Sequence, residues 1–203
     1  MILAVDTSLG TAVALIDADG TRRAESGASD PLGHAEVIGD LLVRVLADAG
    51  DGEITHVVSG MGPGPFTGLR IGIAAARAFA LGRGIPVIPV PSHYAAALGV
   101  GDDGRFAVVT DARRREVAVT VFEGRDDAGL PLVVGDTVLV PAAEADRYLD
   151  GIRRVDVTAL SGVDLATVGA RALAAGRSLA EDEPLYLRHP DVTLPAAPKR
   201  VGP

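Results

Sequence analysis

The chain has 203 residues, 48% of them hydrophobic, which suffices for one ordinary domain or two small ones with a substantial core. A formal net charge of −8 makes the chain alone a poor nucleic-acid binder, and the lack of cysteine excludes disulfides, thiolate zinc sites and cysteine nucleophiles. No leader or membrane-length apolar run is visible, so we expect a cytoplasmic protein without a membrane segment.

The first half of the chain predicts three strands followed by alternating helices and strands. Predicted strands cover residues 2–5, 11–16, 21–26, 55–59 and 86–90, and predicted helices cover residues 34–49, 69–81 and 91–98. The 34–49 segment has apolar residues at helical spacing, and Gly50 is a plausible stop. This order of elements is typical of an α/β fold.

The second half begins after a glycine- and aspartate-rich stretch at residues 99–105, where we place a domain boundary. Its predicted strands are 106–110, 116–122, 136–140 and 155–160, and its predicted helices are 141–149 and 165–175. We therefore expect an N-terminal lobe over residues 1–100, a C-terminal lobe over residues 101–188 and a flexible, proline-rich tail over residues 189–203.

The start of each half carries the same pattern. An apolar strand ends at Asp6 in the first half and at Asp111 in the second, and a new apolar run is under way six residues later, at Ala12 and Val117. One interpretation is a duplicated strand–Asp–turn–strand unit. Two unrelated hairpins would give the same pattern, so both interpretations stay open.

The two aspartates are candidate ligands for a magnesium–nucleotide pair. Asp6-Thr7-Ser8 and Asp111 each follow a buried strand, so facing lobes could present both carboxylates to one cleft. Alternatively, each aspartate caps its own turn by a hydrogen bond to the backbone.

The loop GPGPFTG, residues 62–68, joins a predicted strand to a predicted helix. Backbone N–H groups at such a place can bind an anion. However, the loop has no Walker lysine, and Pro63 and Pro65 remove two donors, so we interpret it as a rigid turn.

The helix after this loop has a row of small residues, Gly68, Gly72 and Ala76. Such a row lets another helix approach closely. The neighbour could belong to the same subunit, or to a second subunit that also contacts the 34–49 helix.

The remaining polar motifs are weaker. The four histidines, His34, His56, His93 and His189, include no pair at HxxxH spacing. The run Arg113 to Arg115 could meet a phosphate, although we prefer a solvated turn. No GxSxG elbow is present, which argues against a serine hydrolase.

Four segments together carry a family resemblance: ILAVDTS, GMGPGPFTGLRIG, PVIPVPS and VTDARRREV, with PLYLRHPD near the end. In these segments the chain resembles the bacterial TsaB (YeaZ) family. The resemblance implies the duplicated actin-like fold, known as ASKHA or ribonuclease-H-like, with two lobes and mixed sheets. Pro65 departs from the family's usual serine, and Arg115 from a frequent glycine.

The resemblance also implies a function in making threonylcarbamoyladenosine in tRNA, beside the anticodon. The expected role is a non-catalytic subunit that binds the paralogue TsaD, works with the ATPase TsaE, and reaches tRNA only through the complex. Alone, we expect a homodimer through the first two helices. No firm cofactor is expected; ATP or ADP with Mg at the complex interface stays open, with Asp6, Thr7, Ser8 and Asp111 as candidate contacts. The candidate partner surface comprises His34, Ile38, Leu41, Leu42, Val45, Gly68, Arg70, Gly72, Ala75, Ala76 and Phe79.

The same resemblance explains the expected lack of catalysis. In TsaD an HxxxH pair binds the catalytic metal, and the matching positions here are Ser92 and Ala96. His93 is displaced by one residue, which turns a helical side chain by about 100°. An ATP-dependent phosphotransferase of the same superfamily is the alternative, and a peptidase receives little support.

Overall fold

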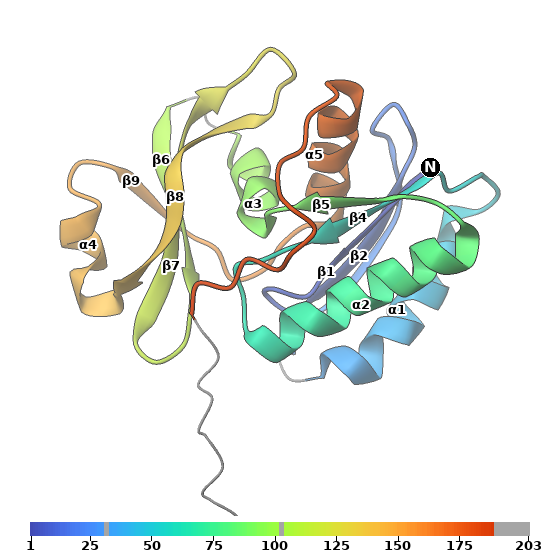
Figure 1. Cartoon of the computed structure of the whole chain (residues 1–203), viewed down its shortest axis with the longest axis horizontal. Helices are drawn as coiled ribbons and strands as arrows, with labels where there is room; N and C mark the ends of the chain where they lie inside the picture. The colour runs from blue at the N-terminus through green and yellow to red at the C-terminus, as the bar shows by residue number, and fades with distance from the viewer. Residues whose placement is uncertain (31–32, 102–103, 189–203) are drawn as a thin grey trace, which may run out of the picture.

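The structure is a computed structural model that describes residues 1–30, 33–101 and 104–188 (Figure 1). Two mixed sheets form two lobes, with strand orders β3-β2-β1-β4-β5 and β8-β7-β6-β9. The strands are β1 (Ile2–Asp6), β2 (Thr11–Ile16), β3 (Arg22–Ala28), β4 (His56–Gly60), β5 (Val87–Val90), β6 (Arg105–Asp111), β7 (Glu116–Arg125), β8 (Pro131–Pro141) and β9 (Arg153–Asp156). The helices are α1 (His34–Ala49), α2 (Phe66–Arg83), α3 (Ser92–Val100), the 3-10 turn η1 (Ala142–Glu144), α4 (Ala145–Tyr148) and α5 (Gly162–Ala174).

Helices cover both faces of the first sheet, which is why its central strands are apolar throughout (Figure 1). Alternate β1 residues point to opposite faces. Leu3 and Val5 pack in the cluster that includes α1 and α2 residues, whereas Ile2 and Ala4 pack in the cluster that includes α5. The first lobe therefore has two cores, one on each side of its sheet.

The second sheet repeats the start of the first in a smaller form. Both sheets contain an antiparallel pair followed by a parallel neighbour, since β1 pairs with β2 and β4, and β6 pairs with β7 and β9. Asp6 lies opposite Ala12, and Asp111 lies opposite Val117. This matched register confirms the predicted duplication. The second sheet has α3 residues on one face and α4 residues on the other.

The C-terminal helix α5 returns to the first lobe. It packs on β1 and β2, and its partner in that layer is α3. Helix α5, from the second half of the chain, therefore completes one core of the first lobe. The division into two domains at residue 100 remains a prediction.

The predicted elements agree with the structure where periodicity is unbroken. Both ends of α1 and of β2 are confirmed. β8 spans Pro131–Pro141 rather than 136–140, because its outer half is exposed at the sheet edge and lacks a continuous apolar pattern. β9 covers Arg153–Asp156 rather than 155–160, and the 141–149 helix divides into η1 and α4. The predicted tail at residues 189–203 lies outside the described residues.

No helix in the described ranges combines the length and apolar character needed to cross a membrane. The cytoplasmic location stays a prediction.

Candidate functional site

Asp6 is buried at the end of β1, with 2% of its surface exposed. One carboxylate oxygen accepts hydrogen bonds from the Ser8 backbone N–H at 2.7 Å and from the Ser8 hydroxyl at 2.5 Å. The other accepts from the Ser92 hydroxyl at 2.5 Å, and Ser92 Oγ in turn accepts from the Gly62 N–H at 3.0 Å. Burial raises the pKa of the Asp6 carboxyl, while the bonds from Ser8 and Ser92 act in the opposite direction.

The end of β4 lies directly against this carboxylate, and the loop after β4 lies against Ser8. A Cβ added at Gly60, the last residue of β4, would come within 1.8 Å of Asp6 Oδ2, and one at Gly64 within 2.8 Å of Ser8 Cα. These glycines are required because the chain occupies the space beside Asp6 and Ser8. Both carboxylate oxygens already have partners within the chain, so the residues around Asp6 do not fit a magnesium–nucleotide pair in this conformation.

The side chain of Thr7 bonds to the backbone of helix α2. Its hydroxyl donates to the Gly68 carbonyl at 2.7 Å and accepts from the Gly72 N–H at 3.1 Å. A Cβ at Gly72 would lie 2.2 Å from Thr7 Oγ1, and one at Gly68 would lie 3.0 Å from His34 Nε2. His34 is itself buried and bonded through Nδ1 to the Thr11 hydroxyl at 2.9 Å.

The small-residue row therefore faces the interior of the monomer, which corrects part of the predicted partner surface. Its members contact Thr7 and the core rather than a second protein. The buried positions of that surface are His34, Ile38, Leu41, Val45, Gly68, Gly72 and Ala76. Leu42, Ala75 and Phe79 are half-buried and Arg70 is exposed. For these four residues, partner contact remains a prediction.

His93 lies in the core between α3 and the second sheet, with 1% of its surface exposed. Its Nδ1 is 2.6 Å from the Thr120 hydroxyl and its Nε2 is 3.0 Å from the Thr110 hydroxyl. Burial lowers the pKa of His93 to about 3, so the ring is neutral at pH 7. Both ring nitrogens of His93 are therefore paired with threonine hydroxyls inside the chain.

The two positions that match the metal ligands of TsaD have other contacts. Ser92 bonds Asp6, and Ala96 packs in the core with Phe106. Within residues 1–30, 33–101 and 104–188, no group of three or more His, Asp or Glu side chains is arranged to hold a metal ion.

Asp111 has a different environment from Asp6. Its side chain is 68% exposed, and its Oδ1 accepts from the Arg113 N–H at 2.9 Å. It caps its own turn, which agrees with the alternative given for strand-end aspartates. It also lines a cavity that Asp6 does not reach. The structure thus does not bring the two candidate ligands to one site.

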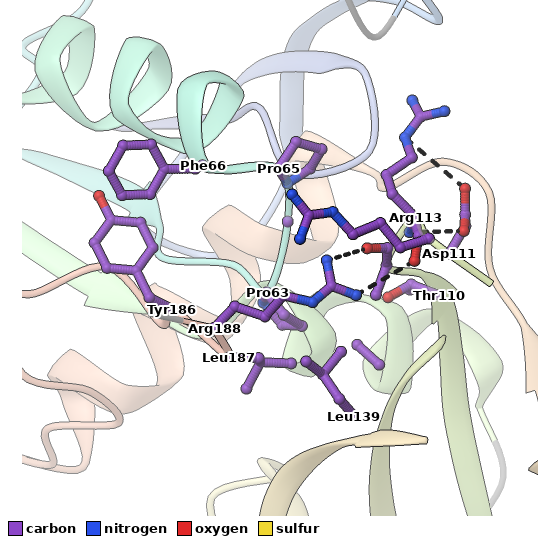
Figure 2. Close-up of a pocket in the computed structure, with 14 residues that line it drawn as sticks. Pro63, Pro65, Phe66, Thr110, Asp111, Arg113, Leu139, Tyr186, Leu187 and Arg188 are labelled. Atoms are coloured by element: carbon purple, nitrogen blue, oxygen red, sulfur yellow. Dashed lines mark hydrogen bonds and ion pairs between the residues drawn. The ribbon is translucent and has the colours of Figure 1, made fainter. Parts of the chain in front are cut away.

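This interlobe cavity, about 380 Å³, lies between the loop after β4 and the β6–β7 turn (Figure 2). Its lining is mostly apolar, with three arginines and one carboxylate. The lining residues are Pro63, Gly64, Pro65, Phe66, Thr110, Asp111, Ala112, Arg113, Arg114, Ala118, Leu139, Tyr186, Leu187 and Arg188. Its volume lies within the usual range for small-molecule sites.

The turn that contributes Arg113 and Arg114 is strained. Arg113, Arg114 and Arg115 have φ angles of 64°, 56° and 64°, in the left-handed region that favours glycine. This conformation costs about 1–2 kcal/mol per residue for L-amino acids. Such strain persists only where surrounding contacts fix the backbone.

Those contacts come from residues 182–188, which we call the C-terminal strap. Arg188 donates to the Ala112 carbonyl at 2.9 Å and to the Arg113 carbonyl at 3.3 Å, and it also pairs with Glu116. At its other end the strap contacts α2, because Arg70 donates to the Tyr186 hydroxyl at 2.8 Å. The strap therefore joins the two lobes and fixes the arginine turn.

Sequence analysis missed the role of the strap. Tyr186 stacks on Phe66, with ring centroids 4.7 Å apart, although 120 residues separate them in the chain. Only the segment PLYLRHPD, noted for its resemblance, pointed to this region. No local pattern in a sequence reports a contact across such a separation.

Comparisons with known proteins complete the description of the site. The family model for tRNA N6-adenosine threonylcarbamoyltransferase matches residues 32–159. The tRNA threonylcarbamoyladenosine biosynthesis protein TsaB of Escherichia coli is 32% identical over 202 residues, which cover 97% of this chain and 82% of that protein. An uncharacterised protein of Mycobacterium leprae is 43% identical over 123 residues, which cover 58% of this chain and 34% of that protein.

The solved structure of YeaZ from Pseudomonas aeruginosa superposes with a TM-score of 0.74 at 25% identity, covering 92% of this chain and 99% of that one. The mycobacterial relatives are longer, since the match spans 34% of the Mycobacterium leprae protein and 60% of its Mycobacterium bovis counterpart.

Proposed function

This chain belongs to the bacterial TsaB (YeaZ) family and has the family's duplicated actin-like fold, and from this premise we propose that it works in threonylcarbamoyladenosine synthesis on tRNA. Its proposed role is that of a non-catalytic subunit that binds TsaD and works with TsaE. It reaches tRNA only through the complex, and in the absence of TsaD it pairs with a second copy.

The observation that carries this proposal is the outer surface of α1 and α2, which lie side by side (Figure 1). Val43 on α1 and Leu81 on α2 are the two most exposed large apolar side chains in the described part of the chain, at 68% and 85%. Half-buried apolar residues accompany them on both helices: Val37, Leu42, Leu46, Ile71, Ala75 and Phe79. We call these eight residues the α1–α2 surface. Exposed large apolar side chains on two neighbouring helices are candidates for a protein interface.

The non-catalytic role is supported by the contacts of three residues of α3. Ser92 and Ala96, which stand where TsaD carries metal ligands, hold Asp6 and pack in the core. His93 is neutral and bonded to Thr110 and Thr120. The phosphotransferase alternative is less favoured, because the Asp6 carboxylate is buried and both of its oxygens accept hydrogen bonds from Ser8 and Ser92.

The test is complex formation with the TsaD of the same organism. The wild-type chain and TsaD should elute together from a sizing column, and the pair with TsaE should transfer threonylcarbamoyl to tRNA. The double variant Val43→Asp/Leu81→Asp should elute apart from TsaD and lower transfer at least about tenfold, since each buried charge at an interface costs 1 kcal/mol or more. Both side chains are exposed, so the variant should keep the wild-type unfolding midpoint.

The matched control is Leu132→Asp/Leu173→Asp, which places two charges at exposed apolar positions of β8 and α5. It should bind TsaD as the wild type does. A wild-type chain that neither elutes with TsaD nor raises its activity would overturn the proposed function. Equal effects of the two double variants on TsaD binding would mean that the α1–α2 surface is not the binding site for TsaD.

A further inference from the structure

The proposed function does not use the interlobe cavity. We propose that this cavity binds a small organic anion, in which a phosphate or carboxylate group is carried on a flat or apolar body, and that Arg113 and Arg114 hold the negative group. The proposal concerns this cavity alone and does not depend on partner binding at the α1–α2 surface.

Charge is the first support. The chain carries a net charge of −8, yet three arginines and a single carboxylate line this cavity. The carboxylate is Asp111, whose ion pair with Arg113 is long, at 3.9 Å, and largely exposed. Exposed pairs of this kind contribute little, so a ligand anion can compete for Arg113. Guanidinium groups match phosphate and carboxylate because they donate two parallel hydrogen bonds.

Backbone conformation is the second support. Three successive arginines adopt left-handed φ angles where glycine would be unstrained. Asp111 holds this turn through the Arg113 N–H, and Arg188 holds it through two carbonyls. A turn that only needed to reverse the chain would not require these contacts. Backbone strain fixed in this way is typical of ligand-binding segments.

The shape and lining of the cavity define the rest of the ligand. Pro63, Pro65 and Leu139 contribute apolar lining, and Phe66 and Tyr186 lie together at one side (Figure 2). The body of the ligand should therefore be flat or apolar, while its anionic end meets the arginine turn. Arg188 adds positive charge but is a positioning residue, because its guanidinium already bonds Ala112, Arg113 and Glu116.

The test uses four probes with the full chain: phenyl phosphate, benzoate, benzamide and inorganic phosphate. Calorimetry at fixed ionic strength measures affinity, and amide shifts of Gly64 and Thr110 report the place of binding. Phenyl phosphate, benzoate or both should bind at millimolar concentration or tighter, and the difference between them identifies the preferred anion. Benzamide, the neutral isostere of benzoate, and inorganic phosphate, which has no apolar body, should bind at least about tenfold more weakly.

The matched variants separate a built site from a general positive field. Arg113→Ala/Arg114→Ala should lower affinity for the bound anion at least about tenfold, because it removes the two guanidiniums. Arg105→Ala/Arg115→Ala removes the same charge from exposed residues that do not line the cavity, and it should leave affinity within about twofold. Arg115 shares the strained turn, so unfolding midpoints of the two variants should be similar.

Three results would overturn the proposal. One is the absence of binding by both phenyl phosphate and benzoate. Another is binding of neutral benzamide as tightly as the better of the two anions, which would make the charge irrelevant. The third is an equal loss in the two double variants, which would mean attraction to a positive surface rather than binding in the cavity.

Discussion

The ends of β1 and β6 occupy the same place in the repeated unit but have opposite environments. Asp6 is buried against Gly60 at the end of β4, with its oxygens bonded to Ser8 and Ser92. Asp111 is exposed and caps a turn of arginines. In the first lobe, the chain after β4 returns over the end of β1 as a loop and α2. In the second lobe, the chain after β9 leads into α5, which packs on the first sheet instead.

This difference shows that the repeated strand–Asp–strand unit does not decide the chemistry of its aspartate. The neighbouring segments decide it: Gly60 of β4 and Ser92 of α3 lie against Asp6, whereas Asp111 is left exposed. The buried end is thereby a structural element and the open end borders a cavity. Three predictions test this contrast.

The largest effect should come from Gly72→Ala at the buried end. The new methyl group would meet Thr7 Oγ1 at 2.2 Å and displace the hydroxyl from its two bonds to α2. We expect a loss of about 3 kcal/mol in the free energy of unfolding, measured by urea denaturation.

Gly82→Ala is the matched control, because it lies on the same helix with no atom within 4 Å of the added Cβ. It should raise stability by about 0.5–1 kcal/mol through helix propensity. A Gly72→Ala protein as stable as the Gly82→Ala protein would mean that Thr7 does not occupy the helix as described. Because the sequence leaves open whether the neighbour of Gly72 lies in the same subunit or in a second one, this experiment also distinguishes these two possibilities.

The next effect compares the two aspartates directly. Asp6→Ala leaves the Ser8 and Ser92 donors without their acceptor in a buried place, so we expect a loss of about 2–3 kcal/mol. Asp111→Ala removes one turn hydrogen bond and an exposed ion pair, which should cost less than about 1 kcal/mol. Equal losses of unfolding free energy in urea denaturation would mean that Asp6 and Asp111 contribute equally to stability, against the contrast drawn here between a buried and an exposed strand end.

The smallest effect concerns His93, which follows Ser92 in α3 and reaches Thr110, the neighbour of Asp111. The unfolded chain binds a proton with the ordinary pKa of 6.5, whereas the folded chain holds that pKa at about 3. Stability should therefore fall as the pH drops below 6.5, by about 2 kcal/mol at pH 5 from this residue.

The control is His93→Gln, whose amide can bond both threonines but does not titrate in this range. The stability difference between pH 7 and pH 5 should be smaller in the variant by about the same 2 kcal/mol. All other ionisable groups are the same in both proteins, so their contributions cancel in the comparison. An unchanged pH profile would place His93 in a solvated environment.

How far the sequence predicts this molecule depends on the range of the contact. The bounds of α1 are predicted because its apolar spacing is unbroken and Gly50 follows it. The repeat at Asp6 and Asp111 is predicted because the same spacing from the aspartate to the next strand occurs in both halves of the sequence. These are local patterns, which a linear reading can detect.

The candidate site was less predictable, because its contacts join distant segments. The row Gly68, Gly72 and Ala76 correctly indicates a close neighbour, but a row of small residues does not identify that neighbour. Here it is Thr7, one side chain of the same subunit, rather than a partner helix. Likewise, nothing near Arg188 indicates that it bonds the turn after Asp111.

The late position of α5 in the chain affects how the first lobe can fold during synthesis. Residues 162–174 leave the ribosome long after β1 and β2, yet they supply one covering layer for those strands. Until then Ile2, Ala4 and Ile16 have no α5 to pack against. Nascent chains that end before residue 162 should therefore expose an apolar face of the first sheet, and we expect chaperones to bind this face during translation.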